Sequence, residues 1–391
     1  MVTQTNRHRL IKYSILLFIS FIAVYIRYLG RDVLSDDIKN CVTGWYNELV
    51  SAGPGINSLL NYTGDYAMPY VFLIWLISKS SLPLIYSIKI IHALFDFGLA
   101  VVVGKIIKYF RPENDNSFCW GYCVTLLLPN VFLNSCYWGQ CDVIYTFFLF
   151  AAFLSFLYKK YPIVMIFFGI AFSVKLQSVF FLPFLLIAYW LLKEFSVLQF
   201  LIVPVVMLVM NIPAMIAGYS PLITFAAYNR QINGYPWLYY FYPNLYFFFQ
   251  ARPYYLFGSG AILLTVTAFL IFVVLLIEKK VELNRENIVP ILLWTAYTCA
   301  FFLPTMHERY GYFAEMVAVI MGILNFRRSW MPIGMLLCIL PKYLSALYVI
   351  ENSSAIQMVT AVGNTCLYVV FTCILWHGLF QEERSGVHVE N

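Results

Sequence analysis

Charged residues are scarce in this chain of 391 residues, where Asp, Glu, Lys and Arg together make up 11%. Soluble domains carry roughly 25% charged and 45–50% apolar residues, whereas this chain is 62% hydrophobic and 19% aromatic, with a mean hydropathy of +0.77. The composition therefore excludes a soluble domain and predicts an all-α polytopic membrane protein. The net charge of +6 is then a matter of membrane topology, and no nucleic-acid partner is expected.

Three other patterns are missing. The nine cysteines show no metal-ligand spacing and mostly lie inside apolar runs, as small core residues do. No internal repeat suggests two matched halves. The first apolar run, residues 11–29, does not end in small residues, as a cleavable signal peptide does, but in Arg27, Tyr28 and Leu29. It therefore predicts an uncleaved first span, with the N-terminus in the cytoplasm.

Long apolar runs are what the chain has in abundance. Segments of roughly 17–25 residues predict about twelve transmembrane helices in a single integral membrane domain, residues 1–391. The predicted order is a first span (11–29), a long first outer loop (30–83), spans two to seven (84–217), an aromatic outer loop (218–255), spans eight to twelve (256–377) and a cytoplasmic tail (378–391).

The positions of the basic residues support this topology. Fifteen of the 25 Lys and Arg residues fall on the predicted inner side, as the positive-inside rule requires. They are Arg7, Arg9, Lys12, Lys105, Lys108, Arg111, Lys159, Lys160, Lys193, Lys279, Lys280, Arg285, Arg327, Arg328 and Arg384. An even number of spans also returns the C-terminus to the cytoplasm.

The first outer loop carries an acidic pair, Asp36 and Asp37, about seven residues after the first span. Adjacent carboxylates repel each other and hold water, and ionisable groups kept beside a bilayer are usually functional. Farther along the loop, an amphipathic stretch at Trp45–Val50 and an apolar run at Tyr70–Ser78, which is too short to span, predict interfacial helices.

Other polar residues are predicted at the same outer face, at the ends of separate spans. In chain order they are Trp138-Gly139-Gln140-Cys141-Asp142, Lys175 and Gln177, Arg230 and Arg252, and His307-Glu308-Arg309-Tyr310. Together with the acidic pair, carboxylates, cations and a histidine thus come from five turns to one membrane face. We expect the interior of a helical bundle to bring them together.

This mixture of groups suits the transfer of a sugar from a lipid phosphate. A positioned carboxylate can take the proton from the acceptor hydroxyl, which contributes roughly 10²–10⁴-fold to the rate. Cations stabilise the charge that develops on the departing phosphate. Arg binds phosphate oxygens bidentately, and Lys binds them as a point charge.

The same residues carry a resemblance to a known family. The stretch SDDIKNCVTGWYNEL, WGQCD at a span end, VKLQ two spans later and the MHERY loop, in this order, resemble the GT-C glycosyltransferases. Among them the chain is most similar to bacterial relatives of the mannosyltransferase that adds the second mannose of GPI anchors. The resemblance covers residues 10–330. It departs from the family pattern at Val143, Leu176 and Ala67-Met68, without loss of a charged group.

The resemblance implies a GT-C-like bundle with its active site on the non-cytoplasmic face. It favours a bacterial plasma membrane over the endoplasmic reticulum. The implied activity is that of a hexosyltransferase, which moves a mannose-like or glucose-like sugar from a polyprenyl-phosphate donor to a glycolipid or cell-surface polysaccharide acceptor. No cofactor is expected; a divalent metal shared by Asp37 and Asp142 is the less favoured case.

The resemblance also assigns roles to residues. The family's catalytic carboxylate falls on Asp37, followed by Trp45-Tyr46, and Asp36 stands at the family's glycine position. We therefore predict Asp37 as the general base. The remaining predicted site residues are Asp36 and Asp142 as further carboxylates, Lys175 and Arg309 at the phosphate, and Trp138, Gln140, Gln177, His307, Glu308 and Tyr310 at the substrates.

Several of these residues also have a structural interpretation. Asp36 and Asp37 could cap the following helix, and Asp142 could interact with the dipole of the helix that it opens. Lys175 could be an interfacial residue whose ammonium reaches water, and residues 307–309 could form a solvated loop.

Two other groups are interpreted as structural in the first place. His92 and Asp96 lie one helical turn apart in the second span, and we predict that they form a buried structural pair. The tyrosines and the tryptophan of the aromatic loop are interpreted as an interfacial belt, with sugar stacking as the alternative.

Two other function classes compete with a glycosyltransferase. A transporter or flippase of lipid-linked sugars would show repeats and polar groups near the midplane, whereas the polar groups here gather at one predicted surface. A polymerase or ligase of surface polysaccharide is chemically close. It is expected to carry one dominant arginine-rich outer loop, whereas the cations here come from several short turns.

Overall fold

The computed structural model describes residues 4–380 of the chain. Within this range the regular structure is helical, and the β-type pairings are two isolated bridges, Trp237 with Pro253 and Tyr239 with Met306. The predicted all-α fold class is therefore confirmed. Most of the predicted cytoplasmic tail (378–391), including Arg384, lies outside the described residues.

The chain divides into two compact units. The first unit comprises residues 4–178, 198–234 and 343–350, and the second comprises residues 179–197, 235–342 and 351–380. The chain therefore passes from one unit to the other several times along its length.

The first unit contains all of the first predicted outer loop and its neighbouring helices. Its elements, in chain order, are α1 (Gln4–Leu29), η1 (Asp37–Val42), α2 (Thr43–Ser51), η2 (Ile56–Asn61), α3 (Met68–Ile77), α4 (Leu84–Phe110), α5 (Ser117–Leu127), α6 (Pro129–Phe132), η3 (Leu133–Trp138), α7 (Asp142–Leu157), α8 (Tyr161–Val174), α10 (Ile202–Met210), α11 (Ile212–Ala217) and α12 (Ile223–Asn233).

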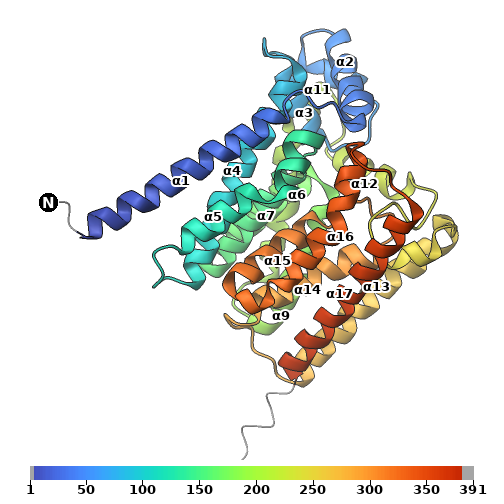
Figure 1. The fold of residues 1–391 in the computed structure, drawn as a ribbon. Coiled ribbons are helices and arrows are strands. Elements are labelled where there is room, and N and C mark those ends of the chain that lie inside the picture. Colours follow the sequence, from blue (N-terminus) through green and yellow to red (C-terminus); the bar gives the residue numbers. More distant parts are fainter. Residues whose placement is uncertain (1–3, 381–391) are drawn as a thin grey trace, which may run out of the picture. The chain divides into compact units, whose positions relative to one another are not determined.

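Long helices of the first unit pack side by side. Helix α4 packs along α5 and α7, and α8 packs between α7 and α10; Figure 1 shows α4, α5 and α7 next to one another. The predicted interfacial helices are present as α2 and α3, which contact each other and η2. Their position at a membrane interface stays a prediction.

Proline divides the third predicted span into shorter pieces. Leu128 has an extended backbone because a residue before proline avoids the helical region, so α5 ends at Leu127. Pro129 then opens α6, where its missing N–H costs no helical hydrogen bond. The chain continues into the π-helical turn η3, and Gly139 ends that turn with a φ of +81°. This interruption places residues 134–142 between two helices, where they form part of the candidate site.

The second unit is built around helix α14 (Ile288–Phe302). This helix is buried along nearly all of its length and packs against α13 (Tyr254–Glu278), α15 (Tyr312–Leu324), α17 (Ser354–Phe380) and α9 (Leu182–Leu192). The remaining elements are η6 (Leu245–Phe249), η7 (Phe326–Arg328) and α16 (Trp330–Ala346), which continues past the unit boundary at its C-terminal end. The short turns η4 (Leu176–Phe181) and η5 (Val197–Leu201) lie where the chain changes units.

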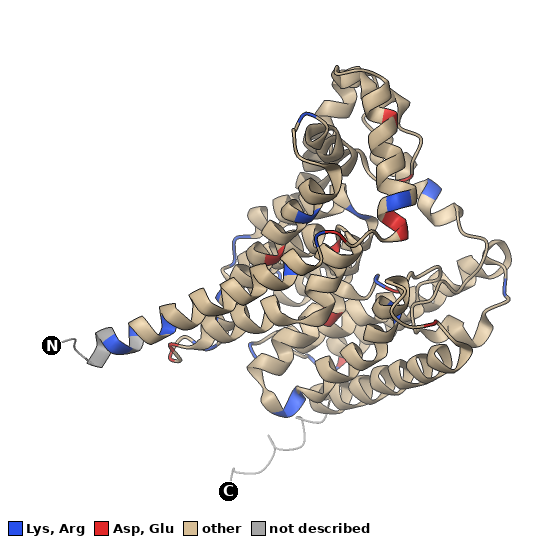
Figure 2. Ribbon diagram, turned by 45° about the horizontal axis from the view of Figure 1, so that its top comes forward, with Lys and Arg blue, Asp and Glu red and all other residues tan. Residues whose placement is uncertain are grey.

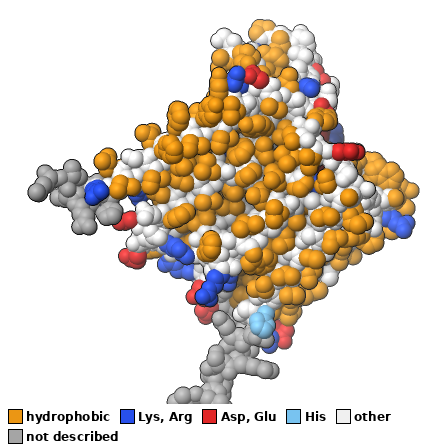
Figure 3. Space-filling view, viewed as in Figure 1, with side chains coloured by type: hydrophobic (Ala, Val, Ile, Leu, Met, Phe, Trp, Pro, Cys, Tyr) orange, Lys and Arg blue, Asp and Glu red, His pale blue; other side chains and the backbone are white. Residues whose placement is uncertain are grey.

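Four helical segments are long and apolar enough to cross a membrane: Arg9–Leu29, Leu84–Phe110, Tyr254–Glu278 and Ser354–Phe380. They expose large apolar side chains, such as Leu17 at 75% and Phe21 at 70%, which water would solvate poorly. Hydrophobic side chains cover most of the face seen in Figure 3, and charged residues are few along the ribbon in Figure 2. These features indicate a membrane protein. The other predicted spans form shorter helices, so the number of twelve crossings and their topology stay predictions.

Candidate active site

Asp37 is held in place by two side chains that lie about 100 residues away in the sequence. Trp138 Nε1 donates a hydrogen bond to Asp37 Oδ2 at 2.6 Å, and Gln140 Nε2 donates to the same oxygen at 2.5 Å. Among the described residues, none donates a hydrogen bond to the other carboxylate oxygen, Oδ1, and the side chain is half-buried. One oxygen is thus fixed by the protein, and the other can accept a proton or a hydrogen bond from a ligand.

Local structure locks the acidic turn to the Trp-Gly-Gln segment. Ser35 Oγ donates to the carbonyl of Trp138 at 2.5 Å and accepts from the backbone N–H of Ile38 at 3.3 Å. Gly139 turns the chain between Trp138 and Gln140 with a left-handed backbone, and a Cβ at this position would overlap the Ile38 side chain. Both the positive φ and the close approach require glycine. The two donors to Asp37 therefore depend on Gly139.

Asp36 has a different environment from its neighbour. It is exposed and accepts a hydrogen bond from the hydroxyl of Tyr348, which belongs to the same unit. Its side chain makes no capping hydrogen bond to η1, so the capping interpretation is wrong for Asp36. The acidic pair is therefore divided between two sets of partners.

Asp142 and Lys175 form a buried ion pair. Lys175 Nζ contacts Asp142 Oδ1, and Asn134 Nδ2 donates to Asp142 Oδ2 at 3.0 Å. The side chain of Asp142 is fully buried and that of Lys175 is 5% exposed, so the ammonium does not reach water as the interfacial interpretation of Lys175 requires. Asp142 thus orients a neighbouring cation. The role of Lys175 at a phosphate stays a prediction.

Three aromatic rings form a cluster that contacts Gln140 through Tyr66. Tyr66 donates from its hydroxyl to Gln140 Oε1 at 3.5 Å, and its ring centroid lies 4.9 Å from that of Trp45 and 5.2 Å from that of Tyr70. Trp45 and Tyr66 are half-buried, so part of each ring is accessible beside the site. Burial raises the pKa of the Tyr70 phenol well above its usual value, and the nearby Cys141 and Asp142 add to the effect.

Sequence reasoning did not assign Ser35, Tyr66 or Asn134 to the site. The only sequence signal for them is their closeness to the acidic pair, to the interfacial run and to the Trp-Gly-Gln segment. Gln177, which was predicted, is 5% exposed, and its Oε1 atom is buried without a hydrogen-bond partner among residues 4–380.

The His307–Tyr310 motif lies in the second unit, against the aromatic loop. The His307 ring contacts the rings of Tyr235 and Tyr240 at centroid distances of 4.7 and 5.2 Å, and its Nδ1 lies 3.9 Å from Glu308 Oε2. Arg309 is 8% exposed, so the motif is not a solvated loop. The proposed contacts of Arg309 and Tyr310 with substrate stay predictions.

The aromatic loop itself is partly internal. Its backbone pairs with the segment before His307: Thr305 N–H donates to the carbonyl of Leu238 at 2.8 Å, and Tyr242 N–H donates to that of Met306 at 3.1 Å. Tyr242 is buried, whereas Trp237 is 46% exposed. Part of the loop thus packs against the His307 segment, and a belt at the membrane interface stays a prediction for the exposed part.

The predicted pair of His92 with Asp96 is wrong. Asp96 Oδ2 accepts from Arg27 Nε at 2.8 Å and from Ser135 Oγ at 2.6 Å. His92 Nδ1 lies 3.4 Å from the carbonyl oxygen of Ser135, and its ring stacks on Tyr70. Helical spacing favoured the neighbour in the same helix, but a buried carboxylate is better stabilised by a cation. The ion pair links α1 to α4.

Among the described residues 4–380, no three His, Cys, Asp or Glu side chains gather as possible metal ligands. Comparison with protein families finds no family that matches the chain, and no curated protein matches its sequence.

Proposed function

We propose that this protein is a membrane-embedded glycosyltransferase. In this proposal it moves a hexose from a polyprenyl-phosphate donor to a glycolipid or polysaccharide acceptor at the non-cytoplasmic face of a bacterial plasma membrane. The observation that carries the proposal is the positioned carboxylate of Asp37, whose Oδ2 is held by Trp138 and Gln140 while Oδ1 receives no hydrogen bond from the described residues.

The chemistry proposed for Asp37 follows from this geometry. Oδ1 takes the proton of the acceptor hydroxyl while that oxygen forms a bond to the anomeric carbon of the donor. The bond between the anomeric carbon and the phosphate oxygen breaks, and its electron pair leaves with the lipid phosphate. A general base contributes roughly 10²–10⁴-fold when it is correctly oriented, and the two donors on Oδ2 provide that orientation.

Two features support a sugar linked to a phosphate as the substrate. Trp45 and Tyr66 present partly accessible rings beside Gln140, and amphipathic aromatic faces suit the apolar face of a sugar ring. Lys175, whose ammonium contacts the buried Asp142, precedes Gln177 by two positions in the sequence. In the proposal this pair acts as a unit: Asp142 holds Lys175, and Lys175 stabilises the charge on the departing phosphate.

A transfer assay tests the proposal. Membranes containing each variant are supplied with labelled polyprenyl-phosphate sugar and extracted acceptors. Asp37→Asn keeps the shape of the side chain but removes the base, so transfer is expected to fall by roughly 10²–10⁴-fold. Asp32→Asn is the matched control, because Asp32 is an exposed carboxylate in the same loop that contacts Arg31 and Tyr86 instead.

The outcomes separate the competing functions. Wild-type turnover in Asp37→Asn, with normal insertion of the protein, would show that the base is wrongly assigned. A larger loss in Asp36→Asn than in Asp37→Asn would assign the base to Asp36. Movement of intact lipid-linked sugar across the membrane, without bond cleavage, would instead identify a flippase.

A further inference from the structure

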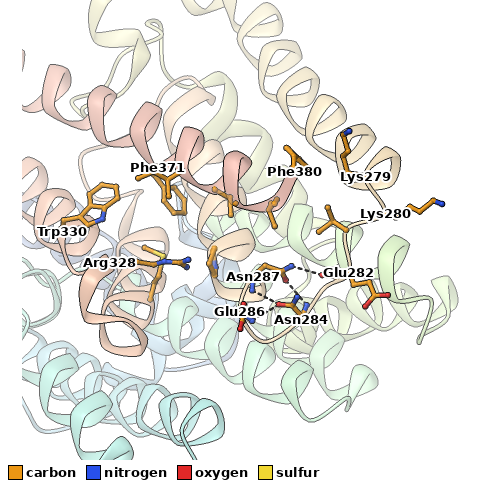
Figure 4. Close-up of a pocket in the computed structure, with 17 residues that line it drawn as sticks. Lys279, Lys280, Glu282, Asn284, Glu286, Asn287, Arg328, Trp330, Phe371 and Phe380 are labelled. Carbon is orange, nitrogen blue, oxygen red and sulfur yellow. Dashed lines mark hydrogen bonds between the residues drawn. The ribbon is translucent and has the colours of Figure 1, made fainter. Parts of the chain in front are cut away.

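The second unit contains a cavity that the proposed function does not use. It has a volume of about 450 Å³ and lies where the C-terminal ends of α13 and α17 meet the start of α14 and the turn η7. Figure 4 shows the residues that line it. By the topology predicted from the sequence, this is the inner face of the membrane, opposite to the face predicted for Asp37.

One wall of the cavity is apolar and belongs to a helix of membrane-spanning length. Phe371 lines it together with Ile374 and Leu375, which follow one helical turn later, and Leu379 and Phe380 line it at the C-terminal end of the helix. Helix α17 is one of the four segments long and apolar enough to cross a membrane. An apolar ligand lying on this wall would therefore lie along the length of the helix.

The opposite wall is polar and its backbone is ordered by hydrogen bonds. Asn284 Oδ1 accepts from the backbone N–H groups of Glu286 and Asn287, at 2.9 and 3.1 Å. Asn287 Oδ1 accepts from the N–H of Asn284 at 2.9 Å, and Asn287 Nδ2 donates to the carbonyl of Glu282 at 2.8 Å. Figure 4 shows the guanidinium of Arg328 pointing into the cavity toward Asn287. The loop is thus prearranged by its own hydrogen bonds, and Arg328 points toward it.

The charges of the lining select among anions. The lining includes three cations, Arg328, Lys279 and Lys280, and two acidic residues, Glu282 and Glu286. In Figure 4 the two lysines lie at the rim and point away from the centre, whereas Arg328 points inward. Arg328 is therefore the cation that faces a ligand inside the cavity. One guanidinium suits a phosphodiester with a single negative charge, whereas a polyphosphate would meet repulsion from Glu282 and Glu286.

We propose that this cavity binds the headgroup of an anionic phospholipid from the inner leaflet. Arg328 forms charge-assisted hydrogen bonds with the phosphodiester, and the glycerol and the first part of the acyl chains lie against α17. Basic pockets between transmembrane helices on the cytoplasmic side are suited to lipid headgroups, and the cavity volume lies within the usual range for small-ligand sites, roughly 300–1,000 Å³.

Lipid retention by the purified full-length protein tests this proposal. Protein in neutral detergent is titrated with dioleoyl phosphatidylglycerol, with dioleoyl phosphatidylcholine and with sn-glycerol 3-phosphate, and binding is followed by native mass spectrometry. Arg328→Gln is expected to weaken phosphatidylglycerol binding roughly tenfold or more, because a hydrogen bond to a charged group is lost. Arg327→Gln is the matched control: Arg327 is the preceding residue, is exposed and does not line the cavity.

A second variant separates binding from folding. Ile374→Trp adds bulk to the apolar wall without changing the charge. The side chain it replaces is 51% exposed, so we expect the helix to tolerate the larger one. Loss of lipid in both Arg328→Gln and Ile374→Trp, with unchanged thermal unfolding, supports the proposal.

Four results would overturn the lipid assignment. Equal losses in Arg327→Gln and Arg328→Gln would indicate general surface charge, and equal retention of phosphatidylcholine would indicate an apolar groove without headgroup selection. Binding of glycerol phosphate as tightly as phosphatidylglycerol would indicate a site for a soluble phosphate ester. Lipid binding that occurs only after deletion of residues 381–391 would assign the cavity to the tail.

Discussion

Removing one hydrogen bond to the proposed base is a sharper test of the site than removing the base itself. Gln140→Met eliminates the Nε2 donor to Asp37 Oδ2 while leaving the carboxylate in place. Gln140 is 4% exposed, and methionine is an unbranched, flexible side chain of similar length that fills irregular space. The substitution therefore removes a donor without opening a large cavity.

The magnitude follows from the charge on the acceptor. A hydrogen bond to a charged group contributes about 1.5–3 kcal/mol, and each 1.36 kcal/mol corresponds to a factor of ten in rate. If this bond serves mainly to orient Asp37, turnover falls roughly 10- to 150-fold by that conversion. The long contact of 3.5 Å between Tyr66 and Gln140 Oε1 is lost as well, but its geometry is marginal, so it contributes little.

A double-mutant cycle decides whether Gln140 acts through Asp37. Transfer is measured under single-turnover conditions for Gln140→Met, for Asp37→Asn and for the combined variant. Because the proposed role of Gln140 requires the carboxylate, its substitution should cost less than about threefold in the Asp37→Asn background. A full 10- to 150-fold loss in that background would refute the reasoning, since the two residues would then act independently.

Two further predictions concern the architecture around this site. Gly139→Ala should lower transfer and stability together, because a left-handed backbone costs about 1–2 kcal/mol for a non-glycine residue and the new Cβ overlaps Ile38. Adding Ile38→Val to this variant should restore part of the transfer activity. If activity is not restored, the overlap with Ile38 is not the cause of the loss. Arg27→Met should lower stability by about 3–5 kcal/mol, because it leaves the buried Asp96 without its cation. Thermal unfolding in detergent measures this loss, and the double variant Arg27→Met/Asp96→Leu should be more stable than Arg27→Met; a less stable double variant would contradict the ion-pair argument.

The helix positions were largely predictable because apolar runs and proline are local signals. The segment 142–157 is helical as expected, and Pro129 marks the interruption of the third predicted span. How many of these helices cross a membrane is a different question, since α8 and α15 have 14 and 13 residues and a straight crossing needs about 20. The number of crossings therefore depends on the length of each helix in the folded chain, and not on hydropathy alone.

The partners of the charged residues were less predictable. Asp96 pairs with Arg27, which lies 69 residues away, and Lys175 pairs with Asp142, which lies 33 residues away. Helical periodicity identifies neighbours within one element, and it therefore suggested His92 for Asp96. Arg27 does stand out in the sequence as the cation that ends an uncharged apolar run. A buried cation in such a place needs a counter-charge, but the sequence does not say which carboxylate supplies it.

The acidic pair shows how two adjacent and identical residues come to have different roles. Consecutive side chains on a helical turn diverge by roughly 100°, so Asp36 and Asp37 cannot both face the Trp-Gly-Gln segment. Asp37 faces Trp138 and Gln140, and Asp36 contacts Tyr348. Because the left-handed turn at Gly139 aligns the two donors on one oxygen, the carboxylate that they hold presents its other oxygen in a fixed direction. A base needs this fixed direction more than it needs a nearby second charge, and for this reason the proposed function gives the proton transfer to Asp37.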